Sequence, residues 1–239
     1  MGLILYNTLM AVAAATALIL IVLMADAVRR SRGDLYLAPW AWAFAALGLV
    51  LVITGAHMTL TWPLNQKFPA DVSPNCCLAD NIIFGEPSLY LGALLLAVSA
   101  SLISTERRRD LTTRVGLGAN PPIETDGSAA LIRDSVLPLS YAGVTGGLML
   151  FVIGFAGAWH GMFIAPPNEP FSSLFRFWNI ETIYVVLAYW LIGIGAVLTP
   201  FALRRRALNW YWGASLVVGA LMIGWLGLVS FFGHISLAG

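Results

Sequence analysis

Six long apolar stretches are the feature of this sequence that most restricts its fold. Each approaches or exceeds the roughly 20 residues that an α-helix needs to cross the hydrocarbon core of a bilayer. Backbone polar groups in lipid must be satisfied within the segment, so spanning stretches of this kind are helices. The sequence therefore predicts an all-α integral membrane protein, a six-helix transmembrane bundle. The predicted helices cover residues 3–28, 39–62, 86–104, 137–165, 181–203 and 209–233.

The composition supports lipid as the solvent of this chain. Hydrophobic residues make up 59% of it and charged residues only 10%, whereas soluble domains are about 25% charged. The lipid bilayer is therefore the first expected partner. The net charge of +1 leaves no basic surface for the phosphates of a nucleic acid.

The basic residues predict the orientation of the helices. Eleven of the 13 fall on one side of the predicted topology, and only Lys67 and Arg176 fall on the other. By the positive-inside rule, the N- and C-termini then lie outside, in a multi-pass protein of the cell (plasma or inner) membrane. The first stretch has no basic residues before it, which favours a retained helix over a signal peptide. The eleven inner residues are Arg29, Arg30, Arg32, Arg107, Arg108, Arg109, Arg114, Arg133, Arg204, Arg205 and Arg206.

An internal similarity divides the chain into two halves. With His57 aligned to His160, and with eight residues deleted from the second loop, Glu86 aligns with Glu181. Both halves run in the same direction, so we interpret them as parallel-related repeats, unlike the inverted repeats of many transporters. The same offset pairs Leu47 with Leu150, Pro63 with Pro166, Asn65 with Asn168 and Phe68 with Phe171. Within a single transmembrane domain, 1–239, this predicts a first repeat at 39–104, a cytoplasmic linker at 105–136, a second repeat at 137–203 and a last helix at 204–239.

The two His/Glu pairs predict a site near the outer face. His234 ends the last outward-running helix and is a weaker third member, and Asp80 is a possible additional ligand. Ionisable groups at membrane depth are costly and usually paired or functional. Imidazole with carboxylate suits copper, iron or zinc. We therefore expect a transition-metal site formed by His57, Glu86, His160, Glu181 and His234.

Other interpretations of the same residues stay open. A histidine at a helix end is often an interfacial hydrogen-bonding group, and a glutamate at a helix start is often a cap that complements the helix dipole. His57 and His160 could instead bind haem b as axial ligands, which is the less favoured cofactor. Trp159 is either the wall of a pocket beside His160 or part of an aromatic belt. The adjacent Cys76 and Cys77 lie in the large outer loop as thiols or as a disulfide.

Three functions follow as hypotheses. The first is a membrane metalloprotein, a metal-dependent oxidoreductase resembling monooxygenases only in its ligand types, or the metal-bearing subunit of such an enzyme. The second is a haem- or quinone-binding anchor of an electron-transfer complex, and the third is a proton-coupled or metal transporter. Other membrane subunits or a second copy of the chain are the expected protein partners. Gly143 and Gly147, four residues apart, predict close packing between helices.

Overall fold

Helices make up almost all of the chain that the computed structural model describes. In chain order they are α1 (Ile4–Arg30), α2 (Ala38–Thr61), the π-helix η1 (Asn81–Gly85), α3 (Glu86–Arg114), α4 (Thr125–Trp159), α6 (Ile180–Ala202) and α7 (Asn209–Ser236). The described residues are 4–31, 35–61, 81–114, 125–163, 180–205 and 208–236. Their side chains are described from residue 8 onward, except those of 81–82, 112–114, 125–128 and 230–236.

Six of these helices are long and apolar enough to cross a membrane, and the described residues include no strand. The prediction of an all-α multi-pass membrane protein is thereby confirmed. The six helices are α1, α2, α3, α4, α6 and α7. Asp80, Cys76, Cys77 and Arg176 lie outside the described residues, in the segments 62–80 and 164–179.

The segment predicted as a linker, 105–136, is largely helical. Helix α3 continues to Arg114 and α4 already begins at Thr125. Side chains of the α3 extension hold the chain that enters α2: the Leu37 N–H donates to Glu106 Oε2 at 3.4 Å, and Arg109 Nη1 donates to the Leu35 carbonyl at 3.1 Å. The apolar stretch of α3 therefore ends before the helix does. The polar side chains of the extension hydrogen-bond to the segment that precedes α2.

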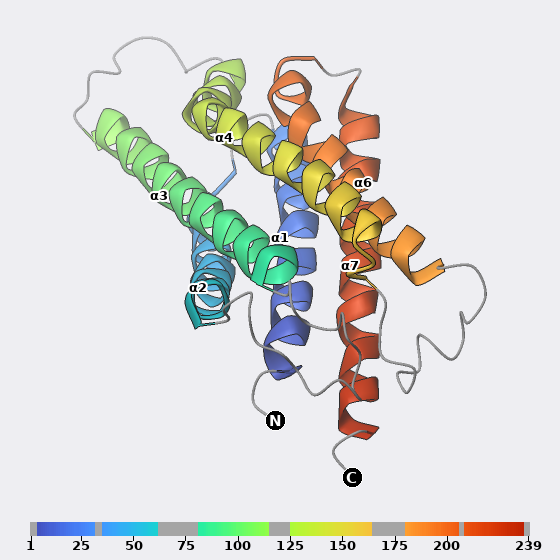
Figure 1. Ribbon diagram of the computed structural model, residues 1–239. Helices are drawn as coiled ribbons and strands as arrows, with labels where there is room; N and C mark the ends of the chain where they lie inside the picture. The colour runs from blue at the N-terminus through green and yellow to red at the C-terminus, as the bar shows by residue number, and fades with distance from the viewer. Residues whose placement is uncertain are drawn as a thin grey trace.

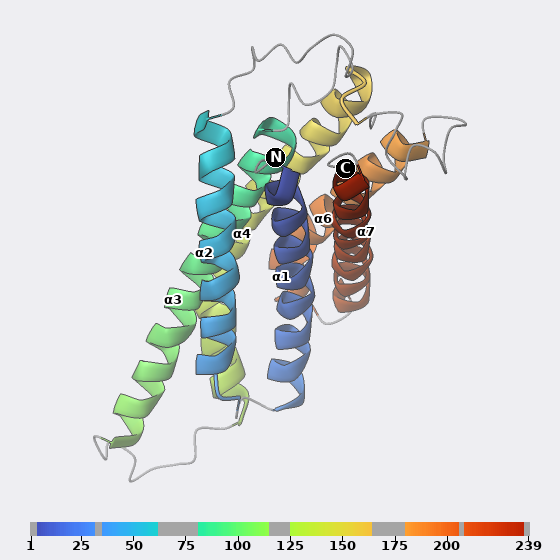
Figure 2. The same cartoon turned by 90° about the horizontal axis from the view of Figure 1, so that it is seen from below.

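The six spanning helices form a closed ring. Each packs against the next in the order α1, α2, α3, α4, α6 and α7, and α7 packs against α1 (Figure 1). Packing is most extensive within three pairs: α2 with α3, α4 with α6, and α7 with α1. The start of α1, the end of α2, the end of α4 and the end of α7 lie toward the same end of the ring (Figure 2).

Glycines allow the helices of two of these pairs, α2 with α3 and α4 with α6, to approach each other closely. A Cβ on Gly48 would lie 3.0 Å from the Gly92 carbonyl oxygen, and a Cβ on Gly147 would lie 2.7 Å from the Gly193 carbonyl oxygen. Such contacts bring backbones together where a larger residue would separate them. The predicted role of Gly147 in close packing agrees with this geometry. Gly143, by contrast, would have nothing within 4 Å of its Cβ.

Candidate functional site

We call the end of the ring that carries His57 and His160 the histidine end. His57 lies inside α2, four residues before its last residue, Thr61. The Thr61 hydroxyl donates to the His57 carbonyl oxygen at 2.6 Å, and its Oγ1 lies 3.4 Å from His57 Nδ1. The His57 side chain is exposed. A histidine in the last turns of a helix, with a local threonine partner, fits the interfacial interpretation as well as a ligand role.

His160 has a different local structure, because it caps α4. The Met162 N–H donates to the Gly157 carbonyl at 2.8 Å and the Gly161 N–H to the Ala158 carbonyl at 3.2 Å. Gly161 has φ 65°, and together these features form a Schellman motif. The helix therefore ends at Trp159, six residues before the predicted end at residue 165. The His160 side chain is exposed at this cap.

The other predicted site residues also lie at the histidine end. Glu86 is the first residue of α3 and Glu181 the second of α6, and both are partly buried. Trp159 is 77% exposed and stacks on Phe155, with ring centroids 6.1 Å apart. His234 belongs to α7, but its side chain is not among those described.

The described residues of the histidine end do not assemble a metal centre. Within the described part of the chain, no three His, Cys, Asp or Glu side chains come together in an arrangement that could hold one ion. His57, Glu86, His160 and Glu181 therefore share an end of the ring without forming one cluster there. A centre that includes Asp80 or the His234 side chain would lie partly outside the described residues.

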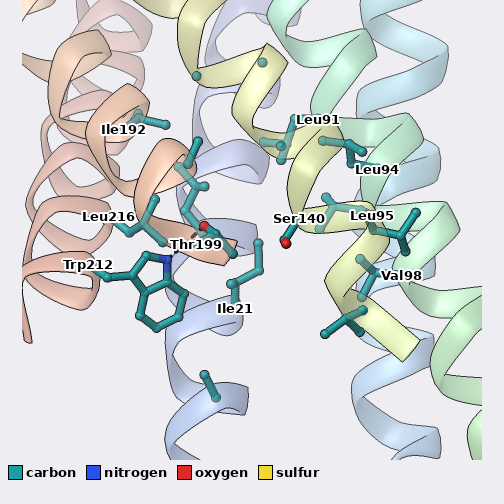
Figure 3. Close-up of a pocket in the computed structure, with 18 of the residues that line it drawn as sticks. Ile21, Leu91, Leu94, Leu95, Val98, Ser140, Ile192, Thr199, Trp212 and Leu216 are labelled. Carbon is teal, nitrogen blue, oxygen red and sulfur yellow. Dashed lines mark hydrogen bonds between the residues drawn. The ribbon is translucent and has the colours of Figure 1, made fainter. Parts of the chain in front are cut away.

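The interior of the ring holds a cavity of about 760 Å³. All six spanning helices contribute to its lining, which is mostly apolar (Figure 3). Leu91, Leu94 and Leu95 of α3 lie across the cavity from Trp212 and Leu216 of α7. The volume lies within the range of about 300–1,000 Å³ that is typical of small-molecule pockets.

Most polar groups in the cavity wall already have partners within the protein. Trp212 Nε1 donates to Thr199 Oγ1 at 3.0 Å, and the Thr199 hydroxyl donates to the Gly195 carbonyl at 2.9 Å. Ser140 Oγ and Tyr90 Oη donate to backbone carbonyls at 2.6 Å and 2.8 Å. Because these groups are satisfied, the wall presents chiefly apolar surface to anything inside.

An apolar cluster forms part of the cavity wall toward the histidine end. Phe163, just after the α4 cap, stacks on Tyr189 with ring centroids 6.0 Å apart. Tyr189 is 5% exposed, and its hydroxyl donates to the Ile83 carbonyl of η1 at 2.6 Å. Ile83 and Leu150 join the same cluster. This hydrogen bond ties α6 to η1 across the ring, so the cavity wall is well packed at this end.

Three arginines line the cavity at its opposite end, which we call the arginine end. Arg29 is in the last turn of α1, Arg133 is in the first part of α4, and Arg204 follows α6. All three side chains are exposed. The described lining includes no Asp, Glu, Lys or His. The sequence suggested these arginines only as indicators of helix orientation, because nothing in their spacing shows that three distant segments line one cavity.

Comparisons with known proteins identify a family but no characterised relative. A search of curated proteins gave no match, and a search of solved structures gave none. A family model described as a protein of unknown function, DUF981, matches residues 1–237, which is nearly the whole chain. The chain belongs to the DUF981 family, whose function is not known.

Proposed function

We propose that this protein binds a lipophilic small molecule inside its helix ring. The observation that carries the proposal is the cavity of about 760 Å³, lined by all six spanning helices. An apolar cavity of this size gains free energy when it takes up an apolar molecule, because buried apolar surface contributes about 25 cal/mol per Å². Because most polar groups of the cavity wall hydrogen-bond within the protein, the ligand needs few hydrogen-bonding groups of its own.

The cavity supports the membrane-anchor hypothesis more than the transporter hypothesis. A quinone, as in the membrane-anchor hypothesis, is one lipophilic molecule that such a lining could accept. A path for protons or metal ions through this cavity has less support, because the only charged residues of its described lining are arginines. Cations would meet like charge at the arginine end and apolar surface beyond it.

The proposal includes an orientation and a location. The arginine end faces the cytoplasm and the histidine end faces outward, as the positive-inside rule predicts, and the membrane is the plasma or inner membrane. The two extensively packed pairs, α2 with α3 and α4 with α6, support the interpretation as parallel repeats. The α7–α1 pair would complete a third, more divergent unit. Association with other membrane subunits or with a second copy of the chain stays a prediction.

Binding of tritiated hexadecan-1-ol to the purified protein in phosphatidylcholine nanodiscs tests the proposal. We expect saturable binding that Gly143→Leu abolishes, because the added side chain enters open space in the cavity. Thr145→Leu is the matched control, since this exposed position on the same helix does not line the cavity. Equal binding by the two variants would place the ligand elsewhere and refute the proposal.

A metal centre at the histidine end is the second proposal. It is supported by the location of both His/Glu pairs at one end of the ring, and it requires residues outside the described set. Metal analysis should then find stoichiometric copper, iron or zinc that is lost in both His57→Ala and His160→Ala. A Soret band would indicate haem b instead, and protein with neither metal nor chromophore would remove both the metalloenzyme and haem hypotheses.

A further inference from the structure

We infer that the ligand of the cavity is an anionic amphiphile, whose apolar tail lies in the ring and whose carboxylate or phosphate head lies at the arginine end. This inference rests on the proposed function, because it names the chemical class of ligand for the same cavity. It is carried by the distribution of charge along the lining: Arg29, Arg133 and Arg204 at one end, and uncharged, mostly apolar residues along the rest.

The three arginines come from segments far apart in the sequence. Arg29 lies in the last turn of α1, Arg133 belongs to α4, and Arg204 follows α6. The described lining offers no acidic residue to neutralise them. The guanidinium group presents donors in a planar fork that matches a carboxylate or a phosphate. Cations that line one end of an apolar cavity thus favour an anionic head over a neutral one.

In each of two adjacent arginine pairs, only one member lines the cavity. Arg30, beside Arg29, forms an ion pair with Asp26 at 2.8 Å and does not line the cavity. Arg205, beside Arg204, does not line it either. Arg204 itself lies over the ring of Tyr141, 5.8 Å from the centroid, and this ring is not part of the cavity lining. Arg133 is the weakest of the three for an anion, because Asp134 Oδ1 is 3.1 Å from its Nε.

The exposure of the arginines also suits an amphiphile. A charged head deep in an apolar cavity would lose its hydration at a large cost. At the arginine end the guanidinium groups are exposed, so the head keeps contact with water while the tail enters the ring. Such a division of polar and apolar contacts is typical of small-molecule sites, in which a few polar groups fix the orientation of an otherwise apolar ligand.

Competition between ligands that differ only in the head tests the inference. Tritiated palmitic acid is bound to the full chain in phosphatidylcholine nanodiscs at neutral pH and displaced by hexadecyl phosphate or by hexadecan-1-ol. We expect at least one anion to bind about tenfold or more tightly than the alcohol, since a hydrogen bond to a charged group is worth that factor. The stronger of the two anions identifies the head.

Paired substitutions separate the cavity arginines from interfacial charge in general. Arg29→Gln with Arg204→Gln should weaken palmitate binding about a hundredfold, tenfold for each residue, and leave hexadecan-1-ol binding unchanged. Arg30→Gln with Arg205→Gln removes the same charge from adjacent positions and should leave both ligands unaffected.

The outcomes distinguish this inference from the proposed function. If the alcohol binds as tightly as both anions, or if the two double variants behave alike, the inference is wrong while the cavity remains a lipophilic site. If neither the alcohol nor the anions bind, the proposed function fails as well.

Discussion

The α2–α3 and α4–α6 hairpins are built alike at their centres and differently at their ends. At the centre, Gly48 meets Gly92 in one hairpin and Gly147 meets Gly193 in the other. The segments that begin with these glycines are themselves similar: Gly-Leu-Val-Leu-Val-Ile-Thr-Gly at 48–55 and Gly-Leu-Met-Leu-Phe-Val-Ile-Gly at 147–154. In the packing, each position of α2 therefore corresponds to the position of α4 that lies 99 residues later. The two histidines, by contrast, are 103 residues apart.

The difference between the two offsets is about one helical turn. His57 follows Gly55 by two residues and His160 follows Gly154 by six, so His160 lies about 6 Å farther along its helix. In the return helices, Gly92 and Gly193 differ by 101 residues while Glu86 and Glu181 differ by 95. Glu181 therefore lies about 9 Å farther from the glycine contact of its own hairpin than Glu86 lies from the contact of the other. Each His/Glu pair is roughly level within its own hairpin, but the second pair lies about one to two helical turns farther from its glycine contact than the first pair does.

The largest expected effect lies at Gly55, where α2 meets the backbone rather than a side chain. A Cβ there would lie 2.5 Å from the Leu89 nitrogen and 2.8 Å from the Gly85 carbonyl oxygen. Backbone cannot move aside without shifting η1, so Gly55→Ala should lower the free energy of unfolding by about 3 kcal/mol. Thermal unfolding in detergent measures this, and a melting temperature equal to that of the wild type would show that the two helices are not in such close contact.

A matched pair compares the two glycine contacts directly. Gly147→Ala should destabilise the protein by about 2 kcal/mol and Gly48→Ala by about 1 kcal/mol, within the usual range for overpacking. The reason is the available space, 2.7 Å against 3.0 Å to the facing carbonyl oxygen. Denaturant unfolding of both variants gives the ranking, and the reverse ranking would contradict the tighter contact in the second hairpin.

Gly154 is the counterpart of Gly55 in the packing register, but it faces a side chain. Its Cβ would lie 2.8 Å from Trp190 Nε1, and this indole donates to the Phe151 carbonyl at 3.3 Å. Because a side chain can rotate away, Gly154→Ala should cost about 1 kcal/mol, roughly the value of the lost hydrogen bond. A loss as large as that of Gly55→Ala, in the same unfolding assay, would mean that the two hairpins are equally rigid here.

The smallest effect is expected at Gly143, which has open space beside its Cβ. Gly143→Ala should leave stability unchanged or raise it by up to about 1 kcal/mol, because alanine is the better helix former. The same unfolding measurement checks this, and a clear destabilisation would show that the ring closes on itself around this position. The substitution also serves as the α4 reference for Gly147→Ala and Gly154→Ala.

Part of the fold could be read from local sequence. The six spanning helices follow from apolar length alone, and they are present as expected. Their bounds were harder to predict, because Arg109 and Glu106 extend α3 through contacts with residues near the start of α2. The end of α4 depends on Gly161, whose positive φ closes a cap before the proline. A local signal for that cap existed in His160-Gly161, but the apolar stretch continues past it to residue 165, where the predicted helix ended.

The candidate site was much less predictable. His57 and His160 stand out in the sequence because histidine is rare in it, whereas most of the cavity lining consists of apolar residue types that are common in any membrane helix. Arg29 and Arg204 could not be told from Arg30 and Arg205, since each pair is adjacent and basic. Only the direction of each side chain in the folded ring separates a cavity residue from its neighbour.

The sequence by itself determined that this chain spans a membrane with six helices, because the length and apolarity of each segment are sufficient for that conclusion. It also placed most of its arginines toward one end of the predicted topology. The tertiary structure alone decided how the helices close into a ring, which glycines face a neighbouring backbone, and which arginines face the cavity. These features depend on contacts between residues that are distant along the chain, and no local pattern of hydrophobicity or charge encodes them.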